Sequence, residues 1–280
     1  MSVDLHLHSN KSDGSDDPAT LVSLASEAGL SAIALTDHDN LDGIIEAQTA
    51  ANKARIEFIP GTELSVNWSG RAMHMLVYFL DPGAGPLQDE LAALQQGRQD
   101  RNHIMVKRLA DLGIEISYEE IDAEADGSGI GRPHFAAVLV QKGYVADIQS
   151  AFDKYLATGR PAYVSRQRLD AQRAIELARD SRAVPVIAHP HTLGISSEDY
   201  REAFLKLASA GLGGIEAYYG EYMPDQRAHL ANLCLQLGIA ATGGSDYHGR
   251  YKKDIFIGRG RGDLDVPDDA IDALLAARDA

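Results

Sequence analysis

The chain alternates between short apolar runs and longer stretches in which apolar residues recur at helical spacing. The short runs have the length and composition of buried strands, and each ends in His, Asp or Glu. They cover residues 3–8, 32–38, 56–63, 184–189 and 239–246. The helical stretches cover residues 21–28, 41–53, 171–178, 200–210 and 225–237. Strands that alternate with helices predict an α/β protein with a mostly parallel sheet covered by helices.

Two parts of the chain depart from this alternation. Residues 62–68 and 72–79, joined at Ser69-Gly70-Arg71, predict a β-hairpin. A long helical stretch over residues 87–112 is followed by shorter ones at 118–125, 134–142 and 148–156, without a convincing strand. We therefore predict one α/β domain from residues 1–85 and 170–280, interrupted by a helical insertion domain over residues 86–169.

Composition narrows the classes of function. The 280 residues are 45% hydrophobic and 24% charged, which suits a compact enzyme. No apolar stretch reaches about 18 residues, and the chain does not open on a basic segment followed by a long apolar one, so we expect a cytoplasmic protein without a membrane span. The net charge of -15 disfavours a surface that binds long nucleic acid. The single cysteine, Cys234, lies in a helical pattern and is expected to be buried rather than reactive.

His6 and His8 flank Leu7 in the first predicted strand, so their side chains project from the same face. Polar residues at the carboxyl ends of successive strands meet where barrel enzymes keep their chemistry. The candidate metal ligands are all imidazole or carboxylate groups, from His6, His8, Asp13, His38, Glu63, His74, His189, Asp246 and His248. This set suits Mn²⁺, Fe²⁺ or Zn²⁺ in an open hydrolytic site. Such ions would make the site locally positive and attract a small anionic substrate.

The order of these residues resembles the polymerase and histidinol phosphatase (PHP) family of the amidohydrolase superfamily. The four motifs of that family match His6-Leu7-His8 with Ser12-Asp13-Gly14, Thr36-Asp37-His38-Asp39, His189-Pro190, and Ser245-Asp246-Tyr247-His248. The resemblance implies a distorted (β/α)7 barrel, here with a helical insertion domain. It also implies a trinuclear metal centre at the carboxyl ends of the strands.

Carried over by position, the resemblance implies divalent ions, about three per chain, with Mn²⁺ favoured and Fe²⁺ or Zn²⁺ as alternatives. The first ion would take His6, His8, Glu63 and Asp246, the second Glu63, His74 and His189, and the third Asp13, His38 and His248. Glu63 would then bridge two ions. Catalytic roles are expected for Asp13, His38, Glu63, Asp246 and His248.

Other histidines lie outside this set. His103 and His229 stand among charged residues in helical stretches and are expected to be solvated, while His191 is a candidate for supporting a metal ligand. His134 follows Gly131-Arg132-Pro133 at a predicted helix start, where backbone N–H groups could meet a phosphate.

Substrate choice is expected to depend on the insertion. Arg132 and Arg160 share a Gly-Arg-Pro context, and arginine suits bidentate phosphate binding. We expect Arg132, His134 and Arg160 to bind the substrate. A substrate that places one phosphate on the metals and another on the arginines would be a small molecule with two phosphates. The chain also resembles the PHP subgroup that hydrolyses 3',5'-nucleotide bisphosphates. That resemblance implies removal of the 3'-phosphate of adenosine 3',5'-bisphosphate to leave AMP and, in some relatives, trimming of short RNA from its 5' end.

Three other functions stay open. Histidinol phosphate phosphatase needs one phosphate and an acidic pocket for the cationic amine of its substrate. A 5'-to-3' exoribonuclease acting on short RNA needs a basic track beyond the first two phosphates, and no Lys/Arg-rich run supports one. A non-catalytic metal-binding module would be expected to lose ligands, whereas here the ligand set is complete. Because nothing resembles a nucleophile elbow or a Walker loop, metal-assisted phosphoester hydrolysis is the leading chemistry.

Overall fold

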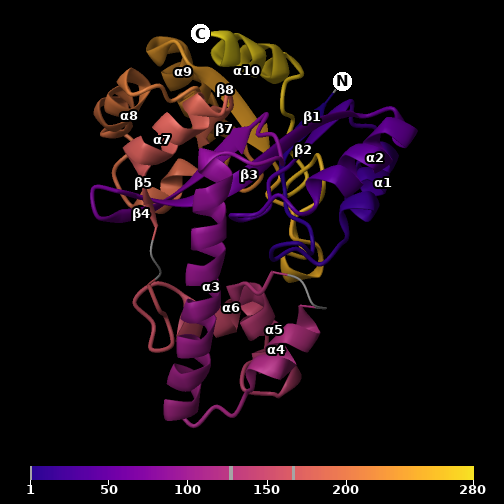
Figure 1. The fold of residues 1–280 in the computed structure, drawn as a ribbon, viewed down its shortest axis with the longest axis vertical. Coiled ribbons are helices and arrows are strands. Elements are labelled where there is room, and N and C mark those ends of the chain that lie inside the picture. Colours follow the sequence, from indigo (N-terminus) through magenta and orange to yellow (C-terminus); the bar gives the residue numbers. More distant parts are fainter. Residues whose placement is uncertain (1, 126–128, 166–167) are drawn as a thin grey trace.

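One curved sheet forms the centre of the protein. The structure is a computed structural model that describes residues 2–125, 129–165 and 168–280. Within these ranges the strand order is β1-β2-β3-β4-β6-β7-β8, with β5 paired to β3 (Figure 1). The strands are β1 (Val3–Leu7), β2 (Ala32–Leu35), β3 (Glu57–Trp68), β4 (Arg71–Tyr78), β5 (Leu169–Asp170), β6 (Val184–Ile187), β7 (Gly214–Tyr219) and β8 (Ala240–Gly244). The prediction of an α/β fold with a distorted barrel is confirmed.

Backbone hydrogen bonds join the first strand to the segment that follows β8. The Asp246 N–H donates to the His6 carbonyl at 2.9 Å, and the His8 N–H donates to the Tyr247 carbonyl at 3.1 Å. The first and last metal motifs of the sequence therefore lie side by side. Most strand pairs are parallel, as predicted, but β4 is antiparallel to β3 and β6 because it returns through the predicted hairpin.

Helices cover the outside of the barrel, as the alternating pattern predicted (Figure 1). They are α1 (Pro18–Glu27), α2 (Ile44–Ala54), α7 (Ala171–Asp180), α8 (Tyr200–Ser209), α9 (Pro224–Leu237) and α10 (Asp269–Asp279), with short 3-10 turns η2 (Pro190–Leu193) and η3 (Gly249–Tyr251). Leu21 of α1 and Ile44 of α2 pack with Ile33 and Leu35 of β2 in one buried cluster. Burial of each such side chain contributes about 1.5–3 kcal/mol, so packing rather than helix propensity holds these helices on the sheet.

The predicted insertion forms a helical lobe on one side of the barrel (Figure 1). It comprises α3 (Pro86–Asp111), α4 (Tyr118–Glu124), α5 (Arg132–Gln141), α6 (Ile148–Ala151) and the π-helical turn η1 (Phe152–Leu156). The long helix α3 starts beside the barrel and extends into the lobe. Met105 and Leu109 of α3 pack with Phe135 and Leu139 of α5 in a hydrophobic cluster made of insertion residues. Leu87, Leu91 and Leu94 at the start of α3 pack instead with barrel residues, so the division of the chain at residues 86–169 stays a prediction.

Cys234 lies on α9 with 1% of its surface exposed. Burial raises the pKa of its thiol to about 12, so the thiolate is scarce near neutral pH. The expectation that this side chain is buried and packs as a small hydrophobe is confirmed.

None of the described helices is both long and apolar enough to cross a membrane.

Candidate metal centre

His6 and His8 project from β1 to the same side, and their Nε2 atoms are 3.1 Å apart. Oε2 of Glu63 lies 3.4 Å from Nε2 of His6 and 3.1 Å from Nε2 of His8. Oδ1 of Asp246 lies 3.6 and 3.3 Å from the same two nitrogens. Ligand atoms about 2.1 Å from a tetrahedral ion stand about 3.4 Å from one another. Each of the two oxygens therefore lies at ligand-like spacing from the same pair of nitrogens.

Glu63, on β3, faces histidines with both of its carboxylate oxygens. Its Oε1 is 2.8 Å from Nδ1 of His74 and 2.9 Å from Nε2 of His189. Its Oε2, which faces β1, is also 3.2 Å from Nδ1 of His38. The side chain is 1% exposed, so water competes little for either oxygen. This arrangement fits a carboxylate that bridges two cations.

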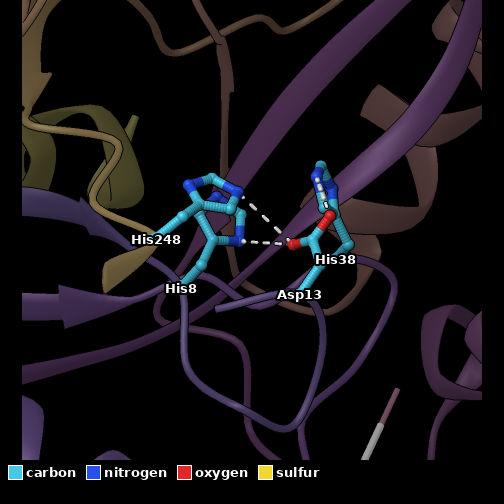
Figure 2. Close-up of side chains that lie close together, drawn as sticks. All are labelled: His8, Asp13, His38 and His248. Carbon is cyan, nitrogen blue, oxygen red and sulfur yellow. Dashed lines mark ion pairs between the residues drawn. The ribbon is translucent and has the colours of Figure 1, made fainter. Parts of the chain in front are cut away.

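A second group of side chains surrounds Asp13 (Figure 2). Oδ1 of Asp13 is 3.8 Å from Nδ1 of His8 and 3.4 Å from Nε2 of His248, and Oδ2 is 3.8 Å from Nε2 of His38. The sequence assigned Asp13, His38 and His248 to a third ion, and the structure adds His8 to this group. Nδ1 of His8 is buried and has no hydrogen-bond partner among the described residues, which fits a ligand atom.

All the metal ligands predicted from the sequence thus lie in one cluster. They are His6, His8, Asp13, His38, Glu63, His74, His189, Asp246 and His248. Most come from the carboxyl ends of parallel strands or from the loops that follow them, as expected for a barrel enzyme. The structure brings these groups together, and their role as metal ligands stays a prediction.

Burial and charge have opposite effects on the ionisation of the cluster. Burial raises the pKa of Asp13, Glu63 and Asp246, but neighbouring histidines and, at Asp246, Lys252 hold the pKa of each carboxyl well below its usual range. Burial also lowers the pKa of His38 well below its usual range. Ionised carboxylates and a neutral imidazole are the forms that bind metal ions.

Glu216, in the middle of β7, contacts the cluster from within the barrel wall. Nδ1 of His6 lies 2.8 Å from its Oε1, and the His189 N–H donates to its Oε2 at 2.7 Å. Because an ionised carboxylate only accepts hydrogen bonds, Nδ1 of His6 is the donor, and Nε2 is left to face the cluster. The sequence analysis missed Glu216, although it alternates with the apolar residues Ile215 and Ala217 in the manner of a strand.

A cavity of about 280 Å³ opens beside the metal cluster. Its lining includes the predicted ligands Asp13, His38, His74 and His189. It also includes the arginines Arg98, Arg101, Arg132 and Arg168. Arginines gathered next to a cation-binding cluster make the cavity attractive to an anion, although the whole chain is acidic.

Two of these arginines are held in place by other side chains. The guanidinium of Arg132, at the start of α5, lies 5.7 Å from the ring centre of Phe152 and 6.0 Å from that of Tyr163. Arg98, on α3, is buried and forms an ion pair with Asp39 at 3.1 Å. Such anchoring reduces the entropy that the side chains lose when an anion binds.

The structure does not bring the other two predicted substrate residues to this cavity. Arg160 is exposed and is not among the described residues that line it, although Thr158 of the same turn is. His134 is 1% exposed, and its Nδ1 accepts a hydrogen bond from the Gly131 N–H at 3.0 Å. Burial lowers the pKa of His134 to about 4, so its ring is neutral and supports the first turn of α5.

The histidines set aside in the sequence analysis lie away from the metal ligands or behind them. His103 and His229 are exposed, as expected, and His103 stacks on Tyr118. Nδ1 of His191 lies 3.0 Å from the hydroxyl of Tyr222, and its ring packs near that of His189. A supporting role for His191 stays a prediction.

A barrel with buried histidines and carboxylates at the carboxyl ends of its strands defines a class of metal-binding hydrolases. Within that class, the model of the PHP domain matches residues 4–180, and the chain belongs to the PHP family. The resemblance stated from the motifs is therefore confirmed.

Two relatives that cover most of the chain and are more than 30% identical to it carry different names. Over 246 residues the chain is 34% identical to a 5'-3' exoribonuclease from Haemophilus influenzae, covering 88% of this chain and 89% of the relative. Over 248 residues it is 33% identical to a 3',5'-nucleoside bisphosphate phosphatase from Chromobacterium violaceum, covering 88% and 87%. A solved amidohydrolase structure from Chromobacterium violaceum, with bound sulfate and no metal, superposes with a TM-score of 0.86 at 32% identity, covering 92% of this chain and 90% of the other. The chain is thus a PHP-family metal-dependent phosphoesterase.

Proposed function

We propose that the protein hydrolyses the 3'-phosphate of nucleoside 3',5'-bisphosphates, converting adenosine 3',5'-bisphosphate to AMP and phosphate. The observation that carries this proposal is the cavity that the metal cluster shares with Arg98, Arg101, Arg132 and Arg168. A substrate with two phosphates can place one at the cluster and the other on the arginines. A substrate with one phosphate would leave one of these anion sites without a partner.

In this proposal the cluster holds about three divalent ions, with Mn²⁺ favoured and Fe²⁺ or Zn²⁺ as alternatives. When bound, such ions polarise a phosphoryl oxygen and lower the pKa of a water molecule. The chain supplies the geometry. His6, His8, Glu63 and Asp246 are proposed to hold one ion, because Glu63 and Asp246 each direct an oxygen at the same two nitrogens, and Glu63 faces His74 and His189 with its other oxygen. Asp13 and His38 line the arginine-rich cavity, and Asp13, with His38 and His248, is proposed to orient the reacting phosphate.

We propose that the uncleaved phosphate binds Arg132 together with Arg98, Arg101 and Arg168. Arg132 keeps the role expected from the sequence, while Arg160 is left out because it is exposed and does not line the cavity. His134 acts indirectly, by accepting the Gly131 N–H and holding the helix start that presents Arg132.

A comparison of three substrates tests the proposal. We expect kcat/KM to be highest for adenosine 3',5'-bisphosphate, lower for a short 5'-phosphorylated RNA, and lowest for histidinol phosphate. The arginine-lined cavity offers no carboxylate besides Asp13 among its described lining residues, so it suits a cationic amine poorly. Hydrolysis of histidinol phosphate at a higher kcat/KM than the bisphosphate would contradict the proposal.

A second candidate function is 5'-to-3' exoribonuclease activity on short RNA, and one observation favours it. A second cavity, of about 450 Å³, meets the first at His38 and Arg98 and carries Gln95, Gln99 and Tyr118 in its lining. This cavity has room for a nucleotide on the far side of the scissile phosphate. A Gln99→Trp variant would narrow it, so a selective loss of activity on a 5'-phosphorylated dinucleotide, with the bisphosphate unaffected, would support this function.

A further inference from the structure

The two carboxylate oxygens of Asp246 face different partners. Oδ1 points into the cluster, 3.6 Å from Nε2 of His6 and 3.3 Å from Nε2 of His8. Oδ2 accepts a hydrogen bond from Nζ of Lys252 at 2.6 Å and another from the hydroxyl of Tyr219 at 2.8 Å. Both lone-pair directions of Oδ2 are therefore engaged outside the cluster.

The backbone of Asp246 adds a second constraint on this carboxylate. Its φ of 57° lies in the left-handed region, which few residues other than glycine adopt. The hydrogen bond from its N–H to the His6 carbonyl holds this conformation. The direction of the side chain thus depends on the barrel seam, and its rotation depends on Lys252 and Tyr219.

Lys252 reaches Asp246 from another side of the molecule. It follows η3 and lines a separate cavity of about 400 Å³, together with Arg250, Lys253 and Arg261. Lys252 is not among the described residues that line the arginine-rich cavity beside the metal cluster. A substrate in that cavity therefore meets Asp13 and the arginines, whereas Lys252 donates to the outer oxygen of Asp246.

We propose that Lys252 is a positioning residue that restricts Asp246 to one ligating oxygen. With Oδ2 bound to an ammonium and a phenol, the carboxylate offers only Oδ1 to a cation, and that oxygen stays directed at His6 and His8. Loss of Lys252 leaves Oδ2 with the weaker, neutral hydrogen bond from Tyr219, so the carboxylate can rotate and present both oxygens. This inference rests on the proposed metal-dependent function, so one of its tests requires no turnover.

The first test measures hydrolysis by Lys252→Met and Lys252→Arg. We expect Lys252→Met to lower kcat by about 10- to 100-fold, the usual effect of removing a residue that orients a metal ligand, with KM for adenosine 3',5'-bisphosphate changed less than about threefold. Lys252→Arg keeps a cationic donor and should recover most of the loss. Lys253→Met is the matched control, because Lys253 is exposed in the same cavity, and it should retain wild-type kcat.

A change of leaving group separates positioning from proton donation. The ribose oxygen needs a proton on departure, whereas p-nitrophenolate does not. A positioning role predicts equal losses on adenosine 3',5'-bisphosphate and p-nitrophenyl phosphate in Lys252→Met. A loss confined to the bisphosphate would overturn the proposal and make Lys252 an acid catalyst.

The test without turnover is the visible absorption spectrum of protein loaded with Co²⁺ alone. A second oxygen from Asp246 raises the coordination number of the ion, which weakens these absorption bands. We expect weaker bands in Lys252→Met than in wild type, Lys252→Arg or Lys253→Met. An unchanged Co²⁺ spectrum, or a kcat for Lys252→Met within threefold of wild type, would overturn the proposal. If wild type does not hydrolyse the bisphosphate, the proposed function fails, and the Co²⁺ spectra still decide the role of Lys252.

Discussion

The carboxylate of Glu216 contacts the metal centre at two points without facing the substrate cavity. Through Oε1 it accepts the Nδ1 hydrogen bond of His6, and through Oε2 it accepts the His189 N–H. The first contact selects the ring tautomer of His6, and the second holds the backbone of His189, whose φ is 25°. A single buried side chain thus sets the geometry of two proposed ligands.

Replacing Glu216 with glutamine should therefore weaken metal binding without opening a cavity in the packed interior. Glutamine keeps the size of the side chain but brings N–H donors and no charge, so it no longer enforces donation from Nδ1 of His6. We expect metal affinity or kcat to fall by about 10- to 100-fold in steady-state assays and metal titrations. Glu57→Gln, at an exposed glutamate on β3, is the control. Equal behaviour of the two variants would show that Glu216 has no orienting role.

The two arginines that the sequence treated as equivalent provide a matched pair. Arg132 lines the cavity, whereas Arg160 is exposed. Arg132→Ala should reduce kcat/KM for adenosine 3',5'-bisphosphate by about 2–4 kcal/mol, the range for losing one partner of a buried charged contact. Arg160→Ala should change it less than about threefold. On 3'-AMP, which lacks the second phosphate, both variants should resemble wild type. A parallel loss on both substrates would remove Arg132 from the proposed clamp.

At the scale of elements, the sequence predicted the strands and helices in which apolar residues recur at one regular spacing. The apolar runs ending in His, Asp or Glu became β1, β2, β3, β6 and β8 with their following loops. Two elements were not predicted: β7, in which Glu216 alternates with apolar residues over only a few positions, and α10 near the C-terminus. In the structure β7 is defined by its pairing with β6 and β8, and α10 packs with residues of β6 and β8 in one buried cluster.

The residues of the site likewise divide into those that local spacing reveals and those that it does not. Ligands in His-x-His, Asp-His and Asp-x-His motifs are close in sequence, so local spacing revealed them. Arg98 and Arg101 of α3 follow the pattern of a polar helix surface, and nothing in their spacing indicates a cavity. Their position depends on how α3 packs between the barrel and the insertion, which is a tertiary property.

His134, at the start of α5, is expected to make the free energy of unfolding depend on pH. The pKa of His134 is about 4 in the folded protein, against about 6.5 in an unfolded chain. Between these values the unfolded state binds more protons than the folded state. The contribution of His134 to the free energy of unfolding is therefore greatest above about pH 6.5 and falls as the pH drops toward 4. The loss from this residue is at most about 3 kcal/mol. His134→Gln keeps an acceptor for the Gly131 N–H and should lose less stability in this window.

Urea unfolding at pH 7.5 and pH 5, with a chelator present throughout, measures this difference. Both proteins share the other titrating groups, so the comparison isolates His134. His229→Gln, at an exposed histidine on α9, should follow wild type. A wild-type and a His134→Gln protein that lose equal stability between the two pH values would contradict a neutral, buried His134.

At the scale of the whole molecule, the cluster brings ionisable groups from both ends of the chain together inside the barrel. The chain has a net charge of -15, yet its carboxylates Asp13, Glu63 and Asp246 are buried where only histidines and cations can balance them. Since β1 and the loop after β8 both contribute ligands, an ion held there would link the two sides of the barrel seam. Metal binding should therefore stabilise the fold as well as support hydrolysis.

Metal removal tests this coupling directly. At free Mn²⁺ about 100-fold above its dissociation constant, one site adds about 2.7 kcal/mol to the free energy of unfolding. For a chain of this size that corresponds to a rise in Tm of about 5 to 10 °C. Chelation should reverse the rise and abolish phosphate release, and Mn²⁺ should restore both.

Asp13→Ala should lower kcat far more than it lowers the metal-free Tm, whereas His103→Ala, at an exposed ring, should change neither. Full activity in protein shown by elemental analysis to be free of metal would refute the metal-dependent mechanism.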